Sequence, residues 1–217
     1  MKNRFLTILT LALAITFTSC KDKAAEVETT DAEVAAEVTE VSTKYLVDTE
    51  ASTIMWKGFK PTGSHTGTIK VESGVFTLNG DAVESGSFII DMASLNVTDL
   101  PVDSEDHAKL SGHLKSPDFF DVEAFPASAF EVTGFTNENG KAMLSGNLKM
   151  KDTENNVTIP VTVTENNGSV TITSETFTID RSKWNVKYGS KSFFDNLGDK
   201  FINDEMELQL TITANKA

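Results

Sequence analysis

Residues 157–164 read Val-Thr-Ile-Pro-Val-Thr-Val-Thr, and residues 205–212 read Glu-Met-Glu-Leu-Gln-Leu-Thr-Ile. In both stretches every second side chain is apolar. A period of two over eight residues indicates a β-strand with one apolar and one wet face. The same alternation, with more noise, marks further strands at residues 52–59, 67–78, 84–92, 129–136, 144–150 and 169–180.

Turn sequences separate these runs, and two of the runs contain a change of phase. The sequence 129–180 is interrupted only by short Asn-, Asp- and Gly-containing turns, so it is predicted to be a four-stranded antiparallel meander. The apolar phase slips at Ser73-Gly74 and at Ser174-Glu175. Such a slip predicts a bulge or bend, which allows a sheet to curl.

About eight strands with a single apolar face must close on themselves or stack. We therefore favour an all-β fold in which one antiparallel sheet closes into an eight-stranded barrel, with a β-sandwich as the alternative. An interior of that size is filled by side chains or holds one small ligand. Gly58, Gly134 and Gly146 share the apolar phase of their strands, which favours a cavity. Short helices are expected at residues 103–115 and 192–197.

The first 44 residues have a different character. Lys2 and Arg4 precede an apolar run at residues 5–17, which is too short to span a bilayer but suits a signal peptide. The only cysteine, Cys20, follows it and resembles the lipid-modified cysteine of a bacterial lipobox. We expect a signal peptide at 1–19, an acidic flexible tether at 20–44 and one folded domain at 45–217. This organisation predicts a lipid-anchored protein of the bacterial cell envelope, at the periplasmic face of the outer membrane or the cell surface.

Composition argues against several function classes. The formal charge of −13 disfavours nucleic acid and anionic headgroup surfaces as partners, because both repel such a chain at long range. Three histidines, with His107 and His113 six positions apart, give little support for a metal site. No Gly-x-Ser-x-Gly elbow or glycine-rich phosphate loop occurs, so we expect a protein without enzymatic activity or cofactor.

Several side chains are candidates for ligand contact, although each has a plainer structural explanation. Arg181 is the only arginine after Arg4; it follows an apolar strand and precedes Trp184, so it would form either a structural salt bridge or a contact to a ligand's polar end. His65 stands at a strand start and is a second candidate for that end. Phe88, Phe130 and Phe177 lie on the apolar faces of strands, where core packing is the ordinary role.

Several motifs, in this order, resemble the YceI-like family. They are Asp106-His107-Ala108-Lys109-Leu110, Phe119-Phe120-Asp121, Phe125 to Phe130, Leu144 to Leu148 with Val157 to Val163, and Ile179-Asp180-Arg181-Ser182-Lys183-Trp184. The continuation from Tyr188 to Asp199 resembles members from Bacteroidetes. The similarity covers residues 45–217.

This resemblance implies a lipocalin-like barrel that binds a polyisoprenoid or fatty-acyl amphiphile in an apolar cavity. By matching position it implies ligand contacts at Leu110, Leu114, Phe119, Phe120, Phe130 and Arg181. The full set of candidate ligand residues adds Phe88, Phe177, Trp184 and His65. The alternative is a non-catalytic interaction or stress module of the envelope whose barrel is filled by its own side chains, and homodimer formation is left open.

Overall fold

The computed structural model describes residues 24–39, 41–138 and 140–217. Strands make up most of this part, which also contains one α-helix and two short 3₁₀ helices. The strands are β1 (Ala25–Glu26), β2 (Thr29–Asp31), β3 (Thr43–Val47), β4 (Thr53–Lys60), β5 (Gly63–Asn79), β6 (Ala82–Val97), β7 (Ala127–Glu138), β8 (Lys141–Met150), β9 (Thr153–Asn166), β10 (Ser169–Ser174), β11 (Phe177–Asp180) and β12 (Glu205–Lys216). The helices are α1 (Glu105–Lys115), η1 (Arg181–Trp184) and η2 (Gly198–Lys200).

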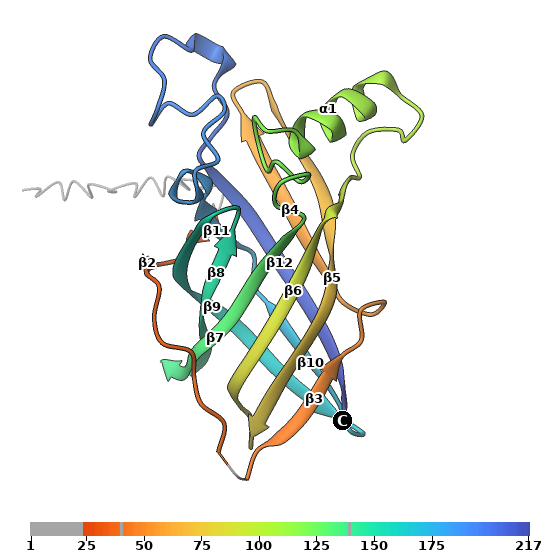
Figure 1. Ribbon diagram of the computed structural model, residues 1–217, viewed down its shortest axis with the longest axis vertical. Coiled ribbons are helices and arrows are strands. Elements are labelled where there is room, and N and C mark those ends of the chain that lie inside the picture. The colour runs from red at the N-terminus through yellow and green to blue at the C-terminus, as the bar shows by residue number, and fades with distance from the viewer. Residues whose placement is uncertain (1–23, 40, 139) are drawn as a thin grey trace, which may run out of the picture.

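Eight strands close into a ring (Figure 1). β5 to β10 are successive antiparallel neighbours, β10 pairs with β12, β12 with β4, and β4 with β5. β3 pairs with both β12 and β5 at the end of the ring opposite α1. A single closed sheet gives the alternating side chains one inside and one outside, so the predicted curled sheet is confirmed at the level of this ring. The described strands form one sheet and not the two of a sandwich.

The two predicted phase slips have different outcomes. The pairing of β5 with β6 shifts register between Val71 and Ser73, which places a bulge at the first slip. At Ser174-Glu175 the predicted strand breaks into β10 and β11, and both pieces pair with β12. β3 was not predicted, because only Tyr45 of its five residues is buried and the stretch is too short to show a period.

The helix α1 begins and ends as its sequence predicts. The Ser104 hydroxyl accepts a hydrogen bond from the His107 amide at 3.1 Å, and Glu105 and Asp106 occupy the first turn. Leu114 is its one buried side chain. The helix expected at residues 192–197 is wrong: this segment forms turns, with Asn196 at φ 62°. A stretch of six residues is too short to sustain a helix without extensive packing.

Part of the segment expected to be a flexible tether is instead paired with strands of the sheet. β1 runs parallel to β11, β2 pairs with β9, and Val27 is buried. The buried Asn147 side chain donates to the Glu33 carbonyl at 2.7 Å and accepts from its amide at 2.9 Å. Backbone and amide hydrogen bonds thus hold a stretch that is poor in apolar residues, which composition does not reveal. The predicted signal peptide and Cys20 lie outside the described residues.

The ring interior at the end that carries β3 is filled by aromatic side chains. Tyr45, Phe76, Phe88 and Phe130 form a continuous row, with ring centroids 5.6, 6.0 and 6.3 Å apart. Two of these rings cover three glycines: a Cβ at Gly74 or Gly86 would crowd the Phe88 ring, and one at Gly146 would collide with the Phe130 ring. Among the described residues, no helix is long and apolar enough to cross a membrane.

Candidate ligand-binding cavity

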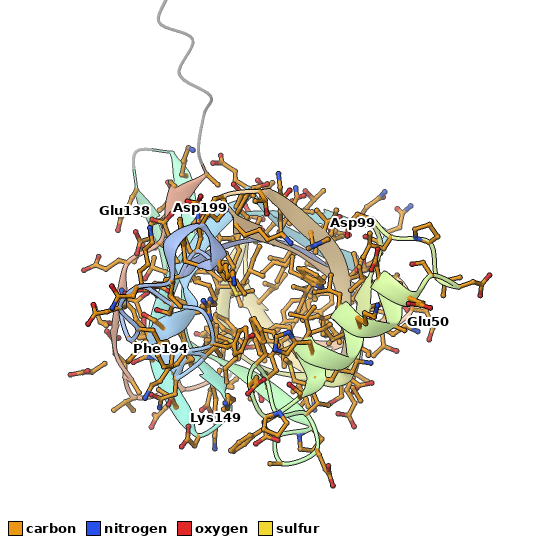
Figure 2. The ribbon with its side chains drawn as sticks, turned by 90° about the horizontal axis from the view of Figure 1, so that it is seen from above. Glu50, Asp99, Glu138, Lys149, Phe194 and Asp199 are labelled. Carbon is orange, nitrogen blue, oxygen red and sulfur yellow. The ribbon has the colours of Figure 1, made fainter. Side chains whose placement is uncertain are left out.

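A cavity of about 500 Å³ occupies the opposite end of the ring, beneath α1. Seen from above, α1 lies on one side of this end and the loop that bears Phe194 and Asp199 lies on the other (Figure 2). The volume falls within the range of about 300–1,000 Å³ that is usual for small-molecule sites. We call this end of the ring the mouth end.

Most of the cavity wall is apolar. The strands contribute inward side chains, α1 contributes Leu110 and Leu114, and the turn after it contributes Phe119 and Phe120. Gly58 on β4 leaves open space, because a Cβ there would meet nothing within 4 Å. The strand side chains of the wall are Trp56, Phe59, Ile69, Leu95 and Met206.

A second cavity of about 100 Å³ lies deeper in the ring. Its lining is entirely apolar and includes Phe88, Phe130 and Phe177. On β4, β5 and β12 its lining residues stand two positions from those of the first cavity, which makes them the next inward side chains along the same strands. The pairs are Ile54 and Trp56, Val71 and Ile69, and Leu208 and Met206. The two cavities therefore follow one another along the interior of the ring.

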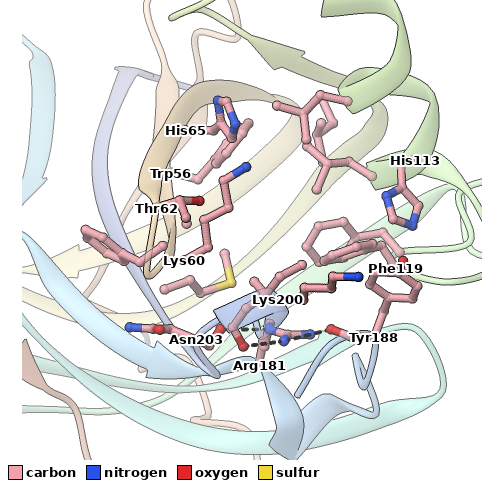
Figure 3. A pocket seen from close by; sticks show the side chains of 18 of the residues that line it. Trp56, Lys60, Thr62, His65, His113, Phe119, Arg181, Tyr188, Lys200 and Asn203 are labelled. Carbon is pink, nitrogen blue, oxygen red and sulfur yellow. Dashed lines mark hydrogen bonds between the residues drawn. The ribbon is translucent and has the colours of Figure 1, made fainter. Parts of the chain in front are cut away.

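Polar groups gather where the first cavity reaches the surface (Figure 3). Lys60 is the last residue of β4, Thr62 lies in the turn that follows it, and Lys200 comes from η2; all three are exposed. His65 Nδ1 lies 2.9 Å from the Asp99 carboxylate, whose other oxygen accepts from the Thr66 amide at 3.0 Å. These contacts tie the start of β5 to the loop that follows β6.

The pKa of Asp99 lies below its ordinary value. Partial burial on its own would raise this pKa, but the hydrogen bonds from the Thr66 amide and from His65 outweigh that effect because they favour the ionised carboxylate. The pair therefore carries a negative charge on Asp99 at neutral pH, next to the mouth of the cavity.

Arg181 lines the cavity, but its guanidinium donates its hydrogen bonds to backbone carbonyls of the protein. Its guanidinium donates to the carbonyls of Asn203, Val186, Tyr188 and Ile202 at 2.7–3.1 Å and lies 3.4 Å from the Asp204 carboxylate. Burial lowers the pKa of Arg181, while Asp204 and Asp180 oppose that shift. Of the two roles open from the sequence, the structure shows the salt bridge, together with a brace for residues 186–204.

An aromatic cluster joins α1 to the loop braced by Arg181. The His113 ring meets Phe119 and Tyr188 edge-on, with centroids 5.0 and 4.5 Å away, and the Phe119 and Tyr188 centroids lie 5.4 Å apart. His113 Nε2 also lies 3.3 Å from Asp118. The two segments that cover the mouth end therefore pack on each other as well as on the ring.

A family model for the YceI-like domain matches residues 45–214. The chain belongs to the YceI-like family. No curated protein matches the sequence. The fold is similar to that of BcnA from Burkholderia cenocepacia, with 22% identity, a TM-score of 0.59, and coverage of 78% of this chain and 99% of that one.

Two further solved structures are similar. A polyisoprenoid binding domain from Saccharophagus degradans, implicated in plant cell wall breakdown, has 12% identity and a TM-score of 0.58, covering 80% of this chain and 98% of that one. A YceI protein from Campylobacter jejuni has 15% identity and a TM-score of 0.48, covering 98% of this chain and 99% of that one. At these identities the likenesses to BcnA and to the Saccharophagus degradans domain show a shared fold.

The structure brings most of the predicted ligand residues of this YceI-like chain to the two cavities. The mouth-end cavity gathers Leu110, Leu114, Phe119, Phe120, Arg181 and His65, and the inner one gathers Phe88, Phe130 and Phe177. Trp184 is fully buried, and its indole donates to the Leu148 carbonyl at 2.8 Å, so it supports the wall and does not line a cavity. Among the described residues, no group of three or more His, Cys, Asp or Glu could hold a metal ion.

Other lining residues were missed by the sequence argument. Trp56 shares the phase of Gly58 on its strand, and phase alone could have found it, whereas Leu95 lies beyond the predicted strand 84–92 and out of phase with Phe88 and Ile90. Tyr188 lies in a loop and Lys200 in the short helix η2, where no period of two indicates direction, and Lys60 lies one position beyond the predicted strand 52–59. Of the three glycines taken as signs of a cavity, Gly58 lines it, whereas the space at Gly146 is taken by the Phe130 ring and Gly134 lines neither cavity.

Proposed function

We propose that this YceI-like protein binds one long-chain amphiphile of the polyisoprenoid class, with its chain in the two cavities and its polar end at the mouth. The observation that carries the proposal is the apolar cavity of about 500 Å³ that continues toward a smaller, wholly apolar one. Each methylene moved from water into such a lining contributes about 0.8 kcal/mol. The similar domain from Saccharophagus degradans, described as polyisoprenoid binding, supports the ligand class.

The mouth suits a polar group that accepts hydrogen bonds. Lys60 and Lys200 have exposed ammonium groups next to the apolar wall, while each of the three guanidinium nitrogens of Arg181 already donates to a protein carbonyl. Exposed lysines remain partly hydrated when they pair with a headgroup, so the pairing avoids the free-energy cost of burying a charge. The protein acts in this proposal as a binding protein or carrier and not as an enzyme.

A filled ring that serves as an interaction module was the alternative from sequence. That description fits the aromatic row at the end that carries β3, but not the hollow mouth end.

The test of the proposed function is saturable binding of a fluorescent prenyl probe to delipidated protein. Gly58→Leu fills the open space at Gly58, so we expect at least a tenfold loss of affinity, whereas Gly134→Leu, which faces neither cavity, should bind as the wild type does. Equal binding by both variants, or no saturable binding by the wild type, would refute the proposal.

The same proposal includes attachment to a membrane of the cell envelope through a lipid on Cys20. Support comes from the short apolar run and the single cysteine that follows it. Two or three acyl chains would make attachment effectively permanent. Mass spectrometry of the amino-terminal peptide, from protein extracted with detergent, should find an acylated Cys20 as the first residue. An unmodified Cys20 in membrane-extracted protein would contradict this part.

A further inference from the structure

The loop between η1 and β12 exposes several large apolar side chains beside the mouth of the cavity. Tyr188, Phe193 and Phe194 are 42%, 45% and 50% exposed. Three exposed rings within seven residues are unusual for a surface that meets only water. Figure 2 shows Phe194 on the opposite side of the mouth from α1.

Part of this loop carries a charge opposite to that of the whole chain. Residues 187–201 contain three lysines and two aspartates, a net charge of +1, whereas the chain as a whole carries −13. Two of the lysines stand over aromatic rings: Lys187 Nζ lies 4.8 Å from the Phe193 ring centroid, and Lys191 Nζ lies 3.4 Å from that of Phe201. Aromatic rings mixed with lysines are the side chains that settle at the interface of a bilayer with anionic lipids.

The acidic residues at the base of the loop are engaged within the protein. Asp180 accepts from the Ser182 amide at 2.9 Å. Asp204 accepts from the Ser192 hydroxyl at 2.6 Å and lies beside Arg181. The Ile202 amide also donates to the Gly189 carbonyl at 2.8 Å. These bonds hold the loop in place while its lysines and rings face outward.

The start of the described chain lies beside this loop, because Glu26 lines one surface groove together with Lys191 and Phe201. β1 pairs Ala25 with Phe177 and Glu26 with Thr178, and β11 leads at Asp180 directly into Arg181, which lines the cavity. Cys20 stands five positions before Ala25, and five residues span at most about 18 Å. A lipid on Cys20 would therefore enter a membrane within reach of the mouth end.

We propose that residues 187–201 form a docking surface for an anionic lipid bilayer, so that the mouth of the cavity faces the membrane. The proposal rests on the attachment described above only for the length of the tether; the loop itself supplies the contact. A mouth held against the bilayer would let an apolar chain pass between the cavity and the membrane with little exposure to water.

The test uses the whole chain on vesicles of phosphatidylcholine and phosphatidylglycerol that contain brominated lipid, which quenches nearby tryptophan. Phe194→Trp places a reporter on the loop, and Leu46→Trp places one at an equally exposed site on β3, at the far end. The native Trp56 and Trp184 are buried and give the background, measured on the wild type. We expect the added emission of Trp at position 194 to fall at least twofold and that at position 46 to stay unchanged.

Two further measurements test the role of charge in docking and the independence of docking from ligand binding. The double variant Lys187→Gln/Lys191→Gln, built on Phe194→Trp, should lose most of the quenching, and so should vesicles without phosphatidylglycerol. Equal quenching at the two positions, or quenching at neither in protein that still sediments with vesicles, overturns the docking surface while leaving the anchor intact. Prenyl-probe binding by these variants should match the wild type, so a failure of the proposed ligand would show separately.

Discussion

The end of the ring that carries β3 is filled, whereas the mouth end is hollow, although the same strands run through both. At the filled end, each of three glycines lies under an aromatic ring that occupies the space the glycine leaves. At the mouth end, no ring covers Gly58 and a cavity of about 500 Å³ follows. A glycine on the inner face of a strand thus indicates a cavity only where no neighbouring aromatic side chain covers it.

Truncating one phenylalanine side chain at each end tests this difference with the largest expected effect. Phe76→Ala leaves a hole in a closely packed row and should lower the free energy of unfolding by about 4 kcal/mol. Phe120→Ala only enlarges an existing cavity, so the loss should be roughly 2 kcal/mol. Urea unfolding of both variants measures the difference; equal losses would mean that the two ends are packed alike.

Removing the brace of the mouth end has the next largest expected effect. Arg181→Met leaves several buried carbonyls without a donor and should cost about 3 kcal/mol. The exposed neighbour Lys183→Met is the control and should cost little. Limited proteolysis should show faster cleavage within residues 186–204 in the Arg181 variant only, and an unchanged pattern would remove the assigned role of the arginine.

The glycines test the same idea on a smaller scale. Gly146→Ala forces the Phe130 ring to move, with an expected cost of about 2 kcal/mol. Gly58→Ala meets nothing and should change stability by less than about 0.5 kcal/mol. Thermal unfolding of the two variants is sufficient, and a large loss for Gly58→Ala would show that the mouth end is packed after all.

The smallest expected effect concerns Asp99 at the mouth. Because the fold lowers its pKa, the stability it contributes is present above the unfolded pKa of about 3.9 and is lost as pH falls through the folded value. Asp99→Asn should therefore be less stable than the wild type by under about 1 kcal/mol at pH 7, since the pair is partly exposed. The difference should begin to narrow below about pH 4. The exposed Asp103→Asn is the control, and a gap that does not narrow between pH 7 and pH 2 would contradict the assignment.

The sequence predicts the strands of the ring better than the segments that cover its mouth end. Period-two alternation locates eight strands and the meander, because a strand with one buried face must repeat every two residues. It cannot locate Tyr188 or Lys200, whose positions depend on the carbonyls gathered by Arg181. It also misses the docking of residues 24–36, since backbone pairing and the amide of Asn147 leave no hydrophobic pattern.

The central claim is that the hollow mouth end receives an apolar chain, and a crystal structure of the protein with a C20 polyprenyl phosphate tests it most directly. We predict one chain between Trp56, Leu114 and Met206, directed toward the inner cavity, with its phosphate beside Lys60 and Lys200. An empty cavity in crystals grown at saturating ligand, or a chain bound only on the outside of the ring, would contradict the account.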